Sequence, residues 1–549
     1  MKQKAKSFGK SAVALAAIGI IAKLIGALYR VPLTNIVGAE GMGLYQMVFP
    51  LYTVLLAFCG GGITSAVSRV VAKYTAIGND AAAQRTLKVA ILPLIAVSVA
   101  STAAVALLRN VISVVQGNAE AGIAYLAICP SLLFAGGINV LRGYFQGKAL
   151  MLPSGVSQLV EQVVKLALGL YLSRLLLPYG VKYAVAGALA GVTASEFFAL
   201  VYLALRFWIS VRKRVRYVAV GSLVAETSAE FSAPRPVTDK MLLKELYSFA
   251  LSVTLGSLVL PITQMIDSVL VINLLMHGGA TRASATAMFG LFVGPVGTLI
   301  NMPTVVALSV AITFLPAITS AVERGGDPSE ITRNTAKWIM LFVIPVTAAF
   351  LFFPDRVCSA LYSRGLTTEQ LDVAAQLLRV QAVSVFYIGV LQLATTVLQG
   401  HNNAHRPVIN LVVGACVKVG LTPLFVRAFG IIGAAGATAA CYAVAATLTV
   451  RCASKRMPIG VSAKDAFIKP VIFTALGAAA FIGTLALTAM TALPSLWQTV
   501  IAGGAFLTVY AAGIIFTGAL DVKAAIAHAR ARRALRRSGG TMTDVPPDN

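Results

Sequence analysis

The sequence predicts an all-α, multi-pass membrane protein with about 14 transmembrane helices, and three observations lead to this fold class. First, 58% of the 549 residues are hydrophobic, only 12% are charged, and the mean hydropathy is +0.83. Second, apolar stretches of about 20 residues recur along the whole chain, and a helix of this length spans a bilayer. Third, the two halves of the chain share a pattern of residues. A transmembrane β-barrel is excluded because it would alternate in segments of roughly 10 residues.

The net charge of +25 reflects membrane topology rather than a nucleic-acid partner. Most of the 45 Lys and Arg residues fall in loops that face one side when the predicted spans are threaded through a membrane. Such an excess marks cytoplasmic loops, and these cations also contact anionic lipids. We therefore expect a bacterial cytoplasmic membrane protein with both termini in the cytoplasm, with anionic membrane lipids as partners and with no nucleic acid bound.

Six spans are predicted in an N-lobe, residues 1–210, and short turns separate them. These spans lie near 11–36, 43–67, 89–108, 121–141, 152–173 and 183–205. Residues 211–244 follow, contain the basic run RKRVR at 212–216 and are too polar to cross a membrane. We expect this segment to be a cytoplasmic linker between the two halves.

Six further spans are predicted in a C-lobe, residues 245–452. They lie near 246–275, 285–318, 336–354, 373–398, 408–427 and 431–450. Pro295 and Pro303 interrupt the second of them, and prolines within a span free backbone carbonyls and bend the helix, so a hinge is expected there. Residues 453–520 add two spans, near 470–491 and 496–518, and a basic cytoplasmic tail occupies residues 521–549.

The two lobes carry an internal repeat. Gln146-Gly147, Pro153 and Lys165 recur in the same order as Gln399-Gly400, Pro407 and Lys418. Helices rich in alanine and glycine resemble one another by composition alone, but the shared order of Gln-Gly, Pro and Lys favours a repeat. The offset is six spans, and an even number keeps the orientation. Parallel six-helix lobes of this kind are typical of alternating-access transporters.

Ionisable residues inside the spans are the candidate functional residues, since each is costly unless it faces a cavity or a partner. They are Lys23, Arg30, Glu161, Lys165, Glu196, Asp267 and Lys418. Lys23, Gly26 and Arg30 are spaced to share one helical face. Arginine suits phosphate through its bidentate fork and lysine through its point charge. We expect Lys23, Arg30, Lys165 and Lys418 to be cavity cations that bind an anionic substrate.

The acidic residues have two interpretations. Glu161 stands four residues before Lys165, in the order that favours an ion pair along a helix. Glu196 and Asp267 either couple transport to a cation, Na⁺ or H⁺, or pair with the intramembrane cations. The sequence does not specify a coupling ion, and no other cofactor is expected.

Motifs of enzymes and metal sites are absent from the sequence. His401 and His405 are four residues apart, but they fall in the turn GHNNAHRP without acidic or cysteine neighbours, so we expect no metal site. The chain contains no Walker A motif, no nucleophile elbow and no HExxH. We therefore expect that the protein is not an enzyme.

The stretch 29–74, and above all GAEGMGLYQ at 38–46, resembles the polysaccharide-export branch of the MOP superfamily. The resemblance covers about 1–520 and is closest to the stage V sporulation protein B group, which is similar to the MurJ-like lipid II flippases. It implies a V-shaped pair of lobes around a cationic cavity, with a groove for a polyprenyl tail at the last two spans. AKLIGALYR carries Lys23 and Arg30 where MurJ-like first spans are basic, and Arg69 comes closest to the basic residue of their second span.

The resemblance implies a flippase that moves an undecaprenyl-diphosphate-linked oligosaccharide or a lipid II-like peptidoglycan precursor across the membrane by alternating access. The usual context of the group is cell-wall synthesis during sporulation, with cell-wall synthases as candidate partners. Two alternatives stay open. A MATE-type multidrug exporter would have an acidic, aromatic cavity, whereas a non-transporting scaffold of a cell-wall synthesis complex would have all intramembrane charges paired.

Overall fold

The computed structural model of the chain describes residues 2–77, 79–221, 238–455, 464–491 and 493–517. This part is helical almost throughout and contains no β-strand. Twelve of its helices are long and apolar enough to cross a membrane, without counting the 26-residue helix Met151–Leu176, which is also long enough to span. Since the first of the twelve, Ile18–Ala76, has a kink at Gly38 and is long enough for two spans, the described residues contain fourteen segments that are long enough to cross a membrane. The predicted fold class is confirmed.

The helices of the N-terminal half agree with the six predicted spans. They are α1 (Lys2–Leu56), η1 (Ala57–Gly61), α2 (Ile63–Ala76), α3 (Asp80–Val115), α4 (Ala121–Ile128), α5 (Ser131–Gly147), α6 (Met151–Leu176), η2 (Leu177–Tyr179) and α7 (Val181–Gly221). The side chain of Asn79 caps α3 by accepting a hydrogen bond of 2.9 Å from the amide of Ala82.

The turn between the first two spans is tighter than predicted. The stretch Gly38–Gly43 was expected to be a short loop, but the helical backbone of α1 continues through it with a single kink at Gly38. Gly38 has φ +69°, in the left-handed region that favours glycine. The second span then runs through the π-helix η1 and α2 to Ala76, well beyond its predicted end near 67.

The helices of the C-terminal half follow the remaining eight spans. They are α8 (Asp239–Ser257), α9 (Val259–His277), α10 (Arg282–Leu291), η3 (Phe292–Val296), α11 (Gly297–Glu323), α12 (Ser329–Phe352), α13 (Pro354–Tyr362), α14 (Thr368–Gly400), α15 (His405–Phe429), α16 (Ile431–Ser454), η4 (Lys464–Ile468), α17 (Lys469–Ala489) and α18 (Ser495–Phe516). Pro295 lies in the π-helix η3, which divides the eighth span, and Pro303 lies within α11. The predicted tail, residues 521–549, lies outside the described residues.

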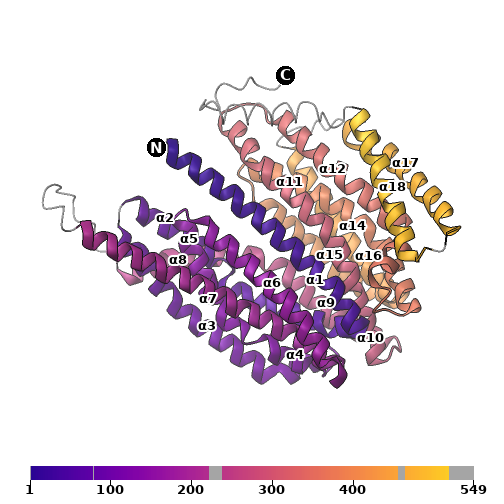
Figure 1. The fold of residues 1–549 in the computed structure, drawn as a ribbon, viewed down its shortest axis with the longest axis horizontal. Coiled ribbons are helices and arrows are strands. Elements are labelled where there is room, and N and C mark those ends of the chain that lie inside the picture. Colours follow the sequence, from indigo (N-terminus) through magenta and orange to yellow (C-terminus); the bar gives the residue numbers. More distant parts are fainter. Residues whose placement is uncertain (1, 78, 222–237, 456–463, 492, 518–549) are drawn as a thin grey trace.

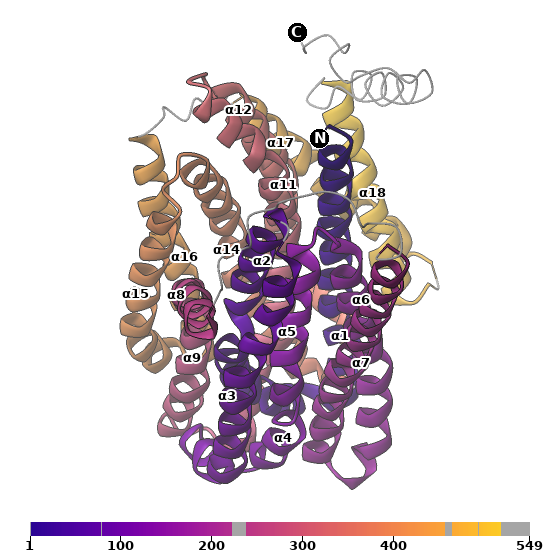
Figure 2. The ribbon, with the colours of Figure 1, turned by 90° about the vertical axis from the view of Figure 1, so that its left-hand side faces the viewer.

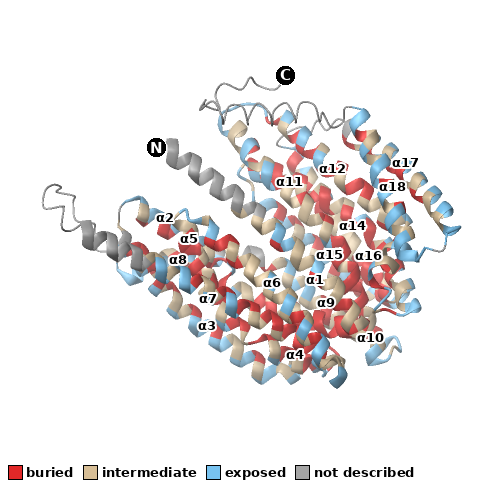
Figure 3. Cartoon of the chain, viewed as in Figure 1, coloured by how far each residue is buried: buried red, intermediate tan, exposed pale blue. Residues whose placement is uncertain are grey.

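The helices form two groups that diverge from a common end (Figure 1). We call α1 to α7 the N-lobe and α9 to α16 the C-lobe. The two lobes meet near α4, α9 and α10, whereas the N-terminus of the chain lies at the opposite end (Figures 1 and 2). The buried residues concentrate where the lobes meet, and α17 and α18 lie at the outer edge of the C-lobe (Figure 3).

Helix α8 packs against the N-lobe, although it begins the first span of the second half. Its residues Leu242, Leu246 and Ala250 join a hydrophobic core built by α2, α3, α5 and α7. The hydroxyl of Thr254 accepts a hydrogen bond of 3.1 Å from the amide of Gly62. The seventh span therefore starts on one lobe with α8 and continues on the other with α9.

The end where the lobes meet is closed by hydrogen bonds as well as by apolar packing, and we call it the gate. The side-chain amide of Gln116 donates to the Met47 carbonyl at 2.9 Å and to the Ser268 hydroxyl at 3.0 Å. Asn118 donates to the Thr286 hydroxyl at 3.0 Å. The bonds to Ser268 and Thr286 cross between the lobes, and because buried polar groups that lose their partners are costly, these two bonds hold the lobes together at this end.

Candidate functional site

The first candidate site is the contact between α1 and α6. Gly26 of α1 faces α6 so closely that a β-carbon there would lie 2.7 Å from Oε1 of Gln162 and 3.7 Å from Nζ of Lys165. The absence of a side chain at Gly26 thus leaves room for the Lys165 ammonium beside α1. Lys23 and Arg30 lie one turn to either side of Gly26 on the same face. The structure therefore brings three of the predicted cations to one helix pair.

These three cations differ in exposure and in contacts. Lys23 is exposed, Arg30 and Lys165 are half-buried, and none of the three forms an ion pair within the described residues. The Arg30 guanidinium lies 5.6 Å from the ring centroid of Phe49, and Nζ of Lys165 lies 5.8 Å from that of Tyr29. An aromatic face contacts a cation without neutralising it, so the three charges remain available to an anion.

Glu161 pairs with Arg142 of α5. The i, i+4 spacing along α6 had suggested Lys165 as its partner instead. Nη2 of Arg142 lies 3.0 Å from Oε2 of Glu161, and its Nε donates to the Ser157 hydroxyl at 2.9 Å. Both charged side chains are largely buried. Arg142 reaches Glu161 because α5 and α6 form an antiparallel pair, and this tertiary contact overrides the local i, i+4 spacing.

Glu196 of α7 lies deep in the N-lobe. It is buried, and the hydroxyl of Tyr52 donates to its Oε1 at 3.5 Å. Lys165 interacts electrostatically with both Glu196 and Glu161. Four cations and two acids thus share this region, which leaves a formal charge of +2. We call Lys23, Arg30, Arg142, Glu161, Lys165 and Glu196 the N-lobe charge cluster.

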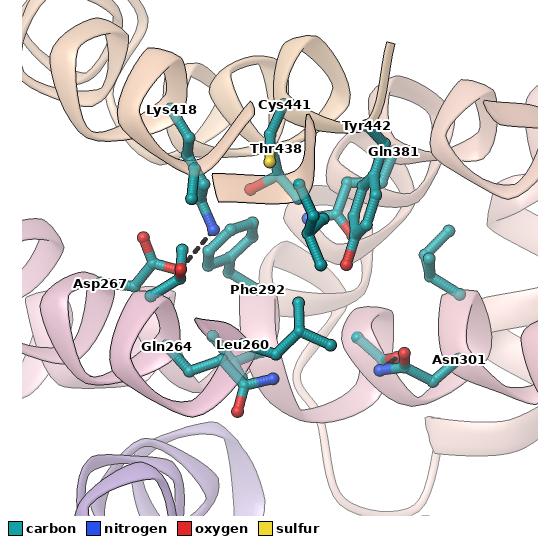
Figure 4. A pocket seen from close by; sticks show the side chains of 16 residues that line it. Leu260, Gln264, Asp267, Phe292, Asn301, Gln381, Lys418, Thr438, Cys441 and Tyr442 are labelled. Carbon is teal, nitrogen blue, oxygen red and sulfur yellow. Dashed lines mark hydrogen bonds and ion pairs between the residues drawn. The ribbon is translucent and has the colours of Figure 1, made fainter. Parts of the chain in front are cut away.

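The second candidate site is a cavity of about 100 Å³ in the C-lobe. Asp267 of α9 forms an ion pair with Lys418 of α15 at its edge, and both side chains are less than 10% exposed. Gln264 and Asn301 lie on one side of the cavity, and Gln381, Thr438 and Tyr442 lie on the other (Figure 4). This cavity carries no net charge, because its carboxylate and its ammonium neutralise each other.

The two lobes differ at matching positions of the repeat. Lys418 meets Asp267 of the first helix of its lobe, whereas Lys165 meets Gly26 of the first helix of its own lobe. Lys165 and Lys418 were both predicted as substrate-binding cations. The structure gives a carboxylate partner from the first helix only to Lys418, and so places the unpaired positive charge in the N-lobe.

Arg69 lies apart from the N-lobe charge cluster. It is exposed on α2, where its guanidinium lies 4.9 Å from the ring centroid of Phe249 on α8. A hollow of about 580 Å³ between α2 and α8 contains both residues, together with the ion pair of Lys73 and Glu245 at 2.8 Å. Arg69 therefore lines a hollow to which Lys23, Arg30 and Lys165 do not contribute.

An apolar groove of about 790 Å³ lies between α11, α12 and α18. Leu24 of α1 lines it at one end, directly after Lys23 in the chain. The predicted hinge residue Pro303 lines its wall, whereas Pro295 is buried in η3 between the lobes. Phe342, Phe506 and Leu507 contribute apolar side chains, so the groove suits a hydrocarbon chain.

Four residues of the first site were not predicted from the sequence. Arg142 lies just beyond the predicted end of the fourth span, near 141, and the structure places it within α5. The others are polar residues that the apolar pattern hid: Tyr29, Tyr52 and Gln162. The hydroxyl of Tyr29 and Oε1 of Gln162 are buried without a hydrogen-bond partner in the described part of the chain. Orphaned polar atoms beside Lys165 indicate a place for a ligand or for water.

The histidines at the end of α14 and the start of α15 do not form a metal centre. Nδ1 of His401 contacts the carbonyl of Val397, and His405 begins α15. Among the described residues, no group of three or more His, Cys, Asp or Glu side chains is placed to hold a metal ion.

Comparison with known proteins relates the chain to one family. Residues 8–322 match the family described as polysaccharide biosynthesis protein. The chain is 28% identical over 470 residues to stage V sporulation protein B of Bacillus subtilis, covering 84% of this chain and 86% of that protein. It is 24% identical over 436 residues to the lipid II flippase MurJ of the same organism, covering 77% and 78%.

Solved structures show the same fold. The inward closed conformation of the lipid II flippase MurJ matches with a TM-score of 0.65 at 14% identity, over 92% of this chain and 98% of that chain. An inward-facing MATE multidrug transporter of the MOP superfamily matches with a TM-score of 0.60 at 14% identity, over 79% and 94%.

Proposed function

Because the chain belongs to the polysaccharide biosynthesis protein family and is similar to the lipid II flippase MurJ, we propose that it is a flippase for a lipid-linked glycan. The substrate is an undecaprenyl-diphosphate-linked oligosaccharide or a peptidoglycan precursor such as lipid II, moved from the inner to the outer leaflet. The observation that carries this proposal is that α1 presents Lys23 and Arg30, which have no ion-pair partner within the described residues, and also lines an apolar groove through Leu24. The substrate likewise combines an anionic headgroup with a hydrocarbon tail.

The N-lobe charge cluster suits the diphosphate. Moving a diphosphate through hydrocarbon requires that protein groups replace its water shell. Lys23 and Arg30 are accessible and have no carboxylate partner, and Lys165 lies across from Gly26 between them. Hydrogen bonds from charged donors to phosphate contribute about 1.5–3 kcal/mol each. Three cations on one helix pair are therefore sufficient to hold the headgroup without a metal ion.

The apolar groove suits the polyprenyl tail. Leu24 joins the groove to the cluster, because it follows Lys23 directly in the chain. A lipid whose phosphates contact Lys23 can thus leave its tail between α11, α12 and α18 while the headgroup stays in the polar region. This arrangement supports the role of the last two spans that the family resemblance implies.

The gate supports transport by alternating access. The lobes are joined at one end and diverge toward the end that carries the N-terminus (Figure 1). With both termini in the cytoplasm, as the basic loops predict, the diverging end faces the inner leaflet and accepts substrate there. Opening of the gate and closing of the other end would then release the headgroup outside.

The charge of the site argues against the two alternatives. A cavity for cationic drugs requires a net negative charge, but the N-lobe charge cluster has a formal charge of +2. A scaffold without transport would have its intramembrane charges paired, and Lys23, Arg30 and Lys165 have no ion-pair partner within the described ranges. The MATE likeness is one of fold, and the charges of the site favour an anionic substrate.

The experiment that tests the proposed function measures flipping of fluorescent lipid II in proteoliposomes. Wild type is expected to flip it. Lys23→Ala and Arg30→Ala are each expected to slow flipping about tenfold or more, because each variant loses one charge-assisted hydrogen bond to the diphosphate. Lys240→Ala removes an exposed cation at the start of α8 and is the control, with wild-type flipping expected. Flipping at wild-type rates in both cluster variants would contradict the proposed site.

A further inference from the structure

The C-lobe cavity has a lining that the binding of a diphosphate does not explain. Its carboxylate, Asp267, and its ammonium, Lys418, neutralise each other, so neither an anion nor a cation is favoured there. The remaining polar lining consists of carboxamides and hydroxyls: Gln264, Asn301, Gln381, Thr438 and Tyr442. Carboxamides both donate and accept hydrogen bonds, as do the hydroxyl and N-acetyl groups of a sugar.

Gln381 is a polar group without a partner in this cavity. Only 4% of the residue is exposed, and its side chain lines the cavity opposite Gln264 (Figure 4). Neither glutamine amide nor the Tyr442 hydroxyl forms a hydrogen bond within the part of the chain that the structure describes. These polar groups line the cavity without a hydrogen bond to the described part of the protein, so they are free to bond a ligand that enters it.

The cavity is also placed to meet the same substrate as the cluster. Helices α9 and α11 and the π-helix η3 line it, and each of these elements also contacts α1, which carries Lys23 and Arg30. The aromatic rings of Phe292 and Tyr442 add apolar faces beside the amides. A neutral group attached to a diphosphate held on α1 can therefore extend into the C-lobe.

We infer that the C-lobe cavity is a glycan subsite, which binds a neutral N-acetylated sugar of the substrate headgroup. This inference rests on the proposed function and divides recognition between the lobes. The N-lobe charge cluster binds the diphosphate, and Gln264, Gln381 and Tyr442 bind the sugar next to it. The ion pair of Asp267 and Lys418 keeps the subsite neutral and holds α9 against α15.

The test compares two lipids on the full-length protein in nanodiscs. One is undecaprenyl diphosphate, and the other is the same lipid carrying an N-acetylated disaccharide. Wild type is expected to bind the glycan lipid about tenfold more tightly than bare undecaprenyl diphosphate, because the sugar forms one or two additional hydrogen bonds. Gln381→Leu and the isosteric Tyr442→Phe are expected to remove most of that difference and to leave the affinity for bare undecaprenyl diphosphate unchanged.

The control is Gln376→Leu, the same change at an exposed position of α14 outside this cavity, and it is expected to leave both affinities unchanged. If Gln381→Leu and Tyr442→Phe keep the wild-type preference for the glycan lipid, this inference would be overturned, whereas the proposed function would stand. Equally weakened binding of both lipids would overturn it too, because the cavity would then not distinguish the lipid with the sugar from the lipid without it. Failure of wild type to bind either lipid would contradict the proposed function as well.

Discussion

Lys165 and Lys418 occupy matching positions of the repeat but have different neighbours. Each stands in the middle of the fifth span of its lobe, and the local sequences around them are alike. The difference comes from the first span, which presents Asp267 to Lys418 and Gly26 to Lys165. A buried cation with a carboxylate partner is neutralised, whereas one without remains available to substrate. The two lysines therefore differ in the residue that the first helix of each lobe presents to them.

Gly26→Asp tests this difference at the residue scale. The new carboxylate would face Lys165 as Asp267 faces Lys418, and displacement of the flexible end of Gln162 makes room for it. We expect about tenfold weaker binding of undecaprenyl diphosphate, because one charge-assisted hydrogen bond is lost to the acid. The measurement is the equilibrium dissociation constant in nanodiscs. Gly26→Asn has the same size without the charge, so equal weakening in both variants would show that crowding is responsible.

The sequence identified the charged residues of the site except Arg142, but it could not identify their partners. Lys23, Arg30, Lys165 and Asp267 were all recognised, because charges within apolar spans are rare and costly. The pairing of Glu161 with Arg142 depends on how α5 and α6 pack, and the i, i+4 spacing along α6 pointed to Lys165 instead. The amides of Gln162 and Gln381 were missed because uncharged residues do not stand out from an apolar pattern.

Helix α8 is the element whose position the sequence did not predict. The apolar pattern correctly placed a span near 246–275, and neither the break between Ser257 and Val259 nor the packing of α8 on the other lobe has a local signal. Likewise the turn at Gly38 was expected, but its continuation as helix was not. Span number and order follow from local hydrophobicity, whereas the assignment of a helix to a lobe is decided by tertiary packing.

Polar contacts at its start help to hold α8 on the N-lobe. A hydrogen bond from Arg85 holds the pKa of the Asp239 carboxyl below its ordinary value, and Lys73 pairs with Glu245 nearby. Because the pKa of Asp239 is lowered in the folded state, its stabilisation is present above the ordinary pKa of aspartate. That stabilisation is lost as the pH falls through the lower, folded-state value.

Docking of α8 is therefore expected to be constant near neutral pH and to weaken only in acid. Spin labels at the exposed positions Ala72 of α2 and Lys240 of α8 report the separation of the two helices. Asp239→Asn is expected to reduce the acid-dependent change in this separation, since the titrating group is removed. The same acid response in wild type and in the variant would assign it to Glu245 or to another carboxyl.

At the scale of the whole molecule, the two lobes form one closed end and one diverging end. The gate joins them through Gln116, Asn118 and Thr286, and the apolar core there includes residues of both lobes. Gly43 of α1 lies against Thr286 with no room for a side chain, so the helices approach closely. A close-packed interface has few intermediate arrangements, and opening is expected to be a switch between two states.

The most direct test of alternating access locks this gate. Asn118→Cys and Thr286→Cys place two thiols where the structure has a hydrogen bond of 3.0 Å between the lobes. A short, reducible cross-linker between them is expected to abolish flipping of fluorescent lipid II in proteoliposomes, and reduction should restore it. Each single cysteine variant, treated in the same way, should keep its activity. Continued flipping by the fully cross-linked protein would contradict transport through an opening gate.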